Sequence, residues 1–61
     1  MNHLFPAAFT AADPVQQRAV FNILSIPFGC EPELLDVLDM FDCAPPHIQH
    51  CCLVAVGLVT R

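Results

Sequence analysis

The first segment with a helical pattern runs from residue 13 to residue 26. Asp13 and Pro14 are in the order of an N-cap followed by proline at the first helical position, and Gln16 has the spacing of a capping box. Pro27 ends the segment. Val15, Ala19, Ile23 and Ile26 share one face, and Val20, Phe21 and Leu24 extend the apolar surface further round. We therefore expect this helix at the centre of the fold, covered on most sides.

The segment 32–42 has the clearest amphipathic pattern in the chain. Its apolar residues fall within an arc of about 160°: Leu34, Leu35, Val37, Leu38 and Phe41. Glu33, Asp36 and Asp39 lie on the opposite side. Met40 falls outside the apolar arc, which makes it a candidate for an exposed hydrophobic contact on the acidic side. The segment predicts a helix with one buried face and one acidic face.

The segment 46–60 is the most ambiguous part of the pattern, because residues 51–59 are rich in β-branched side chains and have no polar face. That stretch alone fits either a helix or a strand. Partner strands are absent from the rest of the sequence, and an isolated strand cannot satisfy its backbone hydrogen-bonding groups. We therefore expect a buried helix with an uncertain end.

Residues 1–12 predict an arm or a short helix that packs Leu4, Phe5 and Phe9 onto the core. The pattern as a whole predicts an all-α single small domain, residues 1–61, of three to four short helices. A chain of 61 residues buries only about 60% of the surface that its unfolded form exposes, so its stability alone is marginal.

The composition excludes several classes of function. Arg18 and Arg61 are the only cations and the net charge is -4, so direct binding of nucleic acid is not expected. The only glycines, Gly29 and Gly57, do not form a phosphate loop, and without a catalytic signature we expect no enzyme and no cofactor. The N-terminus lacks the basic region of a signal peptide, and the apolar run 48–59 is shorter than the roughly 20 residues that span a membrane. We expect a cytoplasmic protein that does not enter membranes.

The four cysteines are expected to be reduced thiols that behave as small buried hydrophobes: Cys30, Cys43, Cys51 and Cys52. Cys43, His47, His50 and Cys51 form a run of zinc-ligating residue types at helical spacing. Pro45-Pro46 interrupts this run, and structural zinc sites usually draw their ligand pairs from separated elements, so we predict no metal site. Cys51 and His47 lack the third, orienting group of a nucleophilic pair.

Five of the six acidic residues lie within twelve positions and are called the acidic cluster: Glu31, Glu33, Asp36, Asp39 and Asp42. One interpretation is a solvated face that keeps an apolar protein in solution. The other is a recognition surface for a basic partner, including imitation of nucleic acid. Acids three residues apart rise about 4.5 Å along a helix, against one phosphate per about 3.4 Å of each DNA strand. The cluster is sparse as a DNA mimic but sufficient for steering and for pairing with a few Arg or Lys side chains.

The short chain, the lack of a catalytic signature and the acidic segment 31–42 resemble the small acidic phage-encoded inhibitors of which anti-CRISPR proteins are the best-known group. The resemblance is one of overall character, so it transfers no residue roles. It implies a non-enzymatic inhibitor that binds a host protein complex with a basic surface and blocks its access to DNA. We expect the acidic cluster and Met40 to make the partner contacts.

Two other hypotheses stay open. One is a small self-associating structural module whose apolar third segment is buried in an oligomer. The other is a zinc-stabilised minidomain. The sequence is compatible with a monomer or a homodimer.

Overall fold

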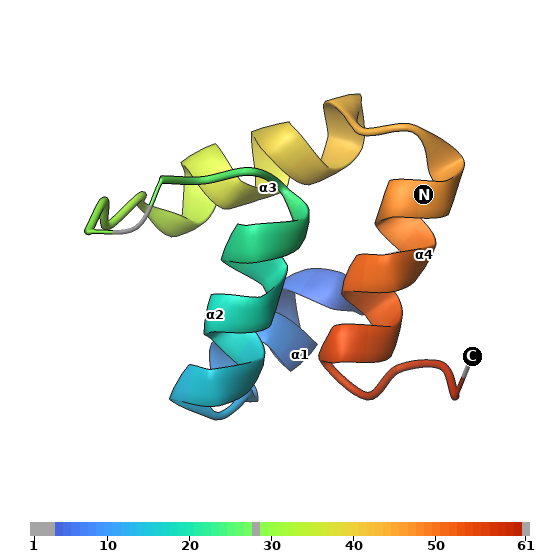
Figure 1. Cartoon of the computed structure of the whole chain (residues 1–61). Helices are drawn as coiled ribbons and strands as arrows, with labels where there is room; N and C mark the ends of the chain where they lie inside the picture. Colours follow the sequence, from blue (N-terminus) through green and yellow to red (C-terminus); the bar gives the residue numbers. More distant parts are fainter. Residues whose placement is uncertain (1–3, 28, 61) are drawn as a thin grey trace.

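The computed structural model describes residues 4–27 and 29–60. Those residues form four helices and no strand (Figure 1): α1 (Phe5–Ala11), α2 (Pro14–Ile23), α3 (Leu34–Cys43) and α4 (Pro46–Ala55). The predicted all-α fold class is confirmed.

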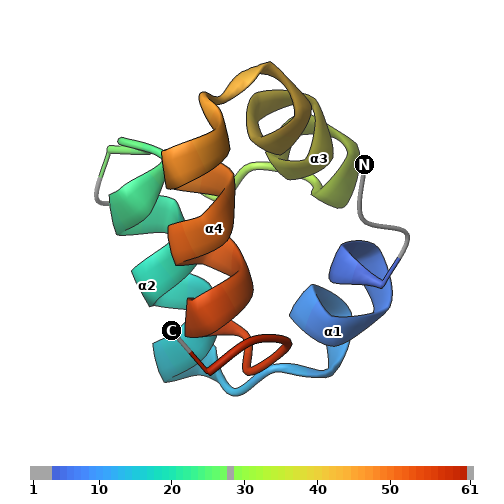
Figure 2. The ribbon, with the colours of Figure 1, turned by 90° about the vertical axis from the view of Figure 1, so that its right-hand side faces the viewer.

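The helices α2 and α4 lie side by side and make the most extensive contact between helices in the described ranges. The helix α3 crosses the end of this pair at which α2 finishes and α4 starts (Figure 1). Figure 2 shows α1 and α3 on the same side of the pair, with α3 above α1. Side chains from all four helices form the core: Phe5, Phe9, Val20, Ile26, Val37, Phe41 and Cys52.

The short helix α1 is held to the core by aromatic contacts. Phe5 stacks on Phe41 of α3, with ring centroids 4.1 Å apart and planes at 8°, and Phe9 lies 5.8 Å from Phe21 of α2. The side-chain amide of Gln17 also donates a hydrogen bond to the carbonyl of Phe9 at 2.9 Å. The predicted packing of Phe5 and Phe9 is therefore confirmed. The same prediction is wrong for the residue before α1, Leu4, whose side chain is exposed.

Two helix starts and one helix end follow local rules. The backbone N–H of Asp13 donates to Oε1 of Gln16 at 3.0 Å, which is the predicted cap of α2. Helix α3 begins at Leu34 rather than at residue 32, because Glu33 has extended dihedral angles and is the N-cap. It ends at Cys43, one residue later than predicted, because the next residue precedes a proline and is extended (ψ 151°).

The helices α2 and α4 end earlier than predicted, and both end in the same way. They finish at Ile23 and Ala55 rather than at residues 26 and 60. Shortly after each end one residue has a left-handed backbone, Ser25 with φ 64° and Gly57 with φ 82°. The N–H of the next residue donates to the carbonyl five positions back, at 2.8 Å after α2 and 2.9 Å after α4. This hydrogen bond is typical of a Schellman motif, which stops a helix.

Several apolar side chains are more exposed than predicted. Val15 is 80% exposed, and Val20 is the only side chain of α2 that is fully buried, so α2 is amphipathic rather than covered on most sides. Leu34 and Leu35 of α3 are 40% and 71% exposed. Helix α4 likewise buries only Cys52 completely. Four short helices leave each helix with one covered face, because there is not enough chain to surround any of them.

Candidate functional site

The acidic cluster lies on α3 and on the segment that leads into it, and all five of its side chains are exposed. Glu31 belongs to the connection, Glu33 is the N-cap, and the three aspartates lie within α3. Asp36 stands in the first turn, where the positive end of the helix dipole favours a carboxylate. From residue 29 to residue 60 the sequence contains these five acids and no Lys or Arg. This half of the chain therefore carries a concentrated negative charge.

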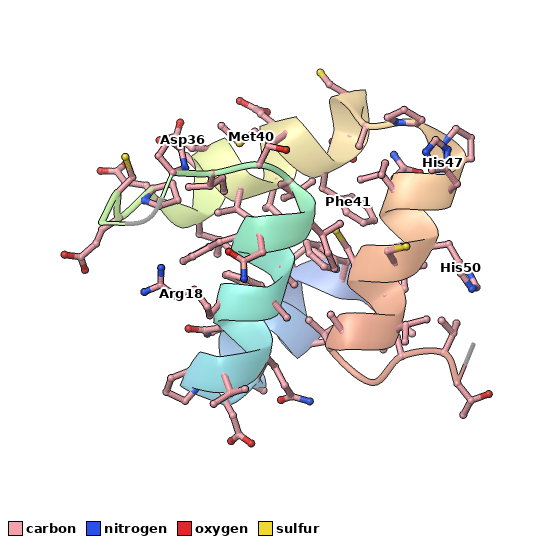
Figure 3. All side chains as sticks on the ribbon, in the orientation of Figure 1. Arg18, Asp36, Met40, Phe41, His47 and His50 are labelled. Atoms are coloured by element: carbon pink, nitrogen blue, oxygen red, sulfur yellow. The ribbon has the colours of Figure 1, made fainter. Side chains whose placement is uncertain are left out.

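The predicted site residues of α3 do not all lie on one face. At about 100° per residue, Asp36 is about 40° from Met40 around the helix axis and Asp42 is about 160° from it. Figure 3 shows Asp36 and Met40 on the side of α3 away from the core, and Phe41 directed toward the other helices. The helix thus places Asp36 on the side of Met40, whereas Asp39, about 100° from Met40 and about 60° from Asp42, lies between Asp36 and Asp42. Asp42 lies on another side, close to the direction of Leu35.

A groove lies beside Met40, where α2 and α3 end and α4 begins; we call it the helix-end groove. Its volume is about 410 Å³. Its lining residues are Ile23, Leu24, Ser25, Met40, Cys43, Ala44, Pro45 and Ile48. Most of these side chains are apolar, and Met40 is 43% exposed. Sequence reasoning found Met40 but missed the groove, because its walls come from three separate helices.

Gln49 fixes the position of α4 against α3 beside the groove, and the sequence did not single it out as a site residue. Its side-chain amide donates a hydrogen bond of 2.7 Å to the carbonyl of Phe41, in the last turn of α3. The backbone N–H of Gln49 also donates to the carbonyl of Pro45, at 3.0 Å. Gln49 therefore joins the first turn of α4 to the end of α3. The sequence signal was the one side-chain amide of α4, next to two histidines.

The run of cysteines and histidines gives the zinc hypothesis no support. Cys43, His47, His50 and Cys51 are all exposed, and Figure 3 shows both histidines on the outer side of α4. Within residues 4–27 and 29–60, no three His, Cys, Asp or Glu side chains come together in a group that could hold a metal ion. The expected burial is wrong for Cys43 and Cys51, because the short helices leave their outer faces uncovered. It is also wrong for Cys30, which lies in the connection between α2 and α3.

The fourth cysteine, Cys52, has the buried environment that was expected of all four. Its side chain is fully enclosed in the core. Burial, and to a smaller extent the neighbouring Cys51 thiol, raise the pKa of Cys52 from 9.0 to about 11. The thiol is therefore protonated at neutral pH and acts as a small apolar side chain, not as a nucleophile.

Comparisons with protein families, with curated proteins and with solved structures found no match. No helix in the described ranges is long and apolar enough to span a membrane. A functional interpretation of this chain therefore has to start from its surface: the acidic cluster, Met40 and the helix-end groove.

Proposed function

We propose that this protein is a non-enzymatic inhibitor of the anti-CRISPR type, encoded by a phage or mobile element and acting in the host cytoplasm. It binds a basic surface of a host CRISPR effector complex and blocks access of that complex to DNA. The contacts come from the acidic cluster and Met40. One observation carries this proposal: five exposed acids lie within twelve residues, and the sequence from residue 29 to residue 60 contains no Lys or Arg.

The acids and the apolar contact are expected to affect different properties of the complex. An exposed ion pair contributes only about 0.2–1 kcal/mol, so five such pairs do not supply a tight complex by themselves. A concentrated charge acts chiefly on the association rate, which steering raises by about 10- to 1000-fold, and on the choice of partner. Affinity then depends on apolar area at the centre of the contact, which Met40 and its surroundings supply.

The test is protection of a targeted phage from CRISPR immunity. Expression of the protein in immune hosts that carry different CRISPR types should restore plaque formation in one of them. The purified effector complex of that host should then bind labelled target DNA more weakly in a gel shift when the protein is present. If plaque formation is restored in no CRISPR type, the proposal is wrong.

The role of the acidic cluster is tested by a pair of variants with equal net charge. Asp36→Asn/Asp39→Asn raises the net charge from -4 by two, and so does Ala11→Lys/Thr60→Lys. Ala11 is the last residue of α1 and Thr60 belongs to the C-terminal segment, and both the end of α1 and that segment lie at the other end of the molecule from α3 (Figures 1 and 2). We expect the first variant to lose inhibition and the second to keep it. Equal inhibition by both folded variants would show that the acids of α3 are not the contact.

A second candidate function is self-association, and one observation favours it. Leu34 and Leu35 are adjacent and remain 40% and 71% exposed, although both belong to the apolar arc of α3. Two copies that met through these residues would bury them. Sedimentation velocity over a range of concentrations tests this, because a monomer at the highest concentration contradicts it.

A further inference from the structure

The helix-end groove is built to accept an apolar group. Ile23 and Leu24 line it from the end of α2, Met40 and Cys43 from α3, and Ile48 from α4. Its volume of about 410 Å³ lies within the range of about 300–1,000 Å³ that is usual for sites that bind small ligands. Met40 is unbranched and polarisable, and such a side chain adapts its rotamer to whatever enters beside it. An apolar side chain of a partner therefore finds both space and apolar contacts here.

The negative charges beside the groove favour positively charged groups next to that apolar side chain. Met40 and Cys43 both line the groove, and each has an aspartate four positions earlier, Asp36 and Asp39. Residues four apart lie on the same helix face, so both carboxylates stand one turn outside the groove on its own side. The carbonyl ends of α2 and α3 add partial negative charge, which the amide end of α4 offsets in part. Two carboxylates beside an apolar groove match an apolar side chain flanked by cations.

Other occupants fit these charges less well. A second copy of the chain carries net charge -4 and has only two Arg residues, so it is repelled from the aspartates. An anionic lipid surface is repelled for the same reason. A neutral apolar molecule leaves the two carboxylates without a partner. A basic segment of a protein is the occupant that uses both the groove and its rim.

We infer that the helix-end groove binds one large apolar side chain of the partner protein, and that Asp36 and Asp39, at one edge of the groove, pair with Arg or Lys residues next to that side chain. This inference rests on the proposed function, because it takes the partner to be a protein with a basic surface. It also assigns different roles to different members of the acidic cluster. Asp36 and Asp39 stand at one edge of the docking groove, whereas Asp42 and Glu31 contribute only to the overall field.

The first experiment uses three fluorescent peptides with the full-length protein. The peptide Gly-Arg-Arg-Leu-Arg-Arg-Gly carries both features, a second has Gly in place of Leu, and a third has Gln in place of every Arg. We expect the first to bind at least about tenfold more tightly than either of the others, since each control removes one part of the match. Equal affinity for the Leu and Gly peptides, or no binding of the first peptide, would overturn the inference.

The second experiment blocks the groove through its own thiol. In a Cys30→Ser/Cys51→Ser variant, Cys43 is the one exposed thiol of the described residues, and N-phenylmaleimide places a bulky neutral group in the groove. The matched control is the same reagent on Cys51 in a Cys30→Ser/Cys43→Ser variant, outside the groove. The thiol of Cys52 should react slowly, because its side chain is enclosed in the core and burial raises its pKa. We expect the label on Cys43 to weaken binding of the Leu peptide by about tenfold or more, and the label on Cys51 to leave it unchanged.

A charge-matched pair of variants separates this inference from the proposed function. Asp36→Asn/Asp39→Asn and Glu31→Gln/Asp42→Asn each remove two negative charges from the acidic cluster. The first pair should weaken binding of the Leu peptide by about tenfold, and the second pair by clearly less, because Glu31 and Asp42 contribute only to the overall field. Equal weakening by both pairs means that the field of the whole cluster acts and the groove does not. The phage protection test stands apart, because it can fail while the peptide binds in the groove, or succeed while the groove stays empty.

Discussion

The two faces of α3 divide the residues that hold the fold from those that are free to bind. On the inner face Val37 and Phe41 are fully or almost fully buried, and Phe41 stacks on Phe5 of α1. On the outer face Asp36 and Met40 are exposed, and no core contact depends on them. A helix of ten residues therefore serves both purposes. Substitutions on the outer face change surface charge at little cost in stability, whereas those on the inner face act on the fold first.

The same contrast recurs on α4 between two consecutive cysteines. Cys51 is exposed, and Cys52 is fully enclosed. Successive residues of a helix point about 100° apart, so one thiol meets solvent and its neighbour meets the core. Identical side chains therefore acquire different chemistry from position alone.

The largest effect is expected from removing the aromatic ring on the inner face of α3. Phe41→Ala deletes the stack with Phe5 and leaves a cavity, which costs about 3–5 kcal/mol. A chain of this length has about 3–9 kcal/mol of stability in total, so the variant should lose a large part of its stability and unfold at a much lower urea concentration than the wild type. Circular dichroism during urea titration measures this. Val37 and Cys52 share the same core and should lose their protection from amide exchange together with it.

The outer side of the same helix supplies the control for that loss. Leu35 is 71% exposed, so Leu35→Ala should change the free energy of unfolding by less than about 0.5 kcal/mol. If the two variants were equally stable, the division of α3 into a structural and a binding face would be wrong.

The next effect concerns the buried thiol of α4 at alkaline pH. The pKa of Cys52 is about 11 in the folded protein, against an ordinary value of 9.0. The protonated thiol contributes its full share to the free energy of unfolding below pH 9. This share is lost as the pH rises toward 11, because the unfolded chain releases the proton at a lower pH than the folded protein. The loss should amount to roughly 2–3 kcal/mol. The chain has no Tyr and no Lys, so the other side chains to control for in this range are the three exposed cysteines.

Urea denaturation at a series of pH values from 8 to 11 measures how steeply the free energy of unfolding falls with pH, which we call the slope. Cys52→Val should remove most of it, because the variant has no buried thiol to ionise. The matched variant Cys43→Ser changes an exposed cysteine and should keep the slope of the wild type. A slope that survives in Cys52→Val would assign the pH dependence to another group.

The fold class was predictable from the sequence because its signals are local. Prolines mark the boundaries, and Asp13 and Gln16 cap α2 as their spacing indicates. The absence of partner strands, rather than the period of residues 51–59, excluded a sheet. The ends of α2 and α4 were not predictable from the period of the apolar residues. Ile26 continues the apolar pattern yet lies beyond the helix, because Ser25 takes a left-handed backbone that serine rarely adopts.

The site was predictable only in part, because some of it depends on contacts between distant segments. The exposure of the acids and of Met40 follows from the amphipathic pattern of one helix. The groove beside Met40 requires α2 and α4 to meet α3 at particular ends, which the Gln49 hydrogen bond to Phe41 helps to set. The apolar pattern also did not predict the exposure of Leu35, because four short helices do not supply enough surface to cover the whole apolar arc.

The smallest effect is expected where α2 ends at the groove. Ser25 lines the groove with φ 64°, whereas the matching position after α4 is Gly57, with φ 82°. A left-handed conformation costs an L-residue about 1–2 kcal/mol, and glycine avoids that cost but loses more entropy on folding. Ser25→Gly should therefore raise the free energy of unfolding by about 0.5–1 kcal/mol in urea, with an unchanged m-value.

The reverse exchange, Gly57→Ser, is the matched control for that substitution. A Cβ atom at Gly57 meets nothing within 4 Å, so steric clash does not contribute and the cost is that of the backbone alone, about 1 kcal/mol. If Ser25→Gly raises the free energy of unfolding and Gly57→Ser lowers it, the two helix ends are equivalent. Ser25 is then a strained residue that is retained beside the groove. Binding of the Leu peptide should be unchanged in Ser25→Gly if that strain plays no part in recognition. Weaker binding in this more stable variant would make the left-handed serine part of the groove's function.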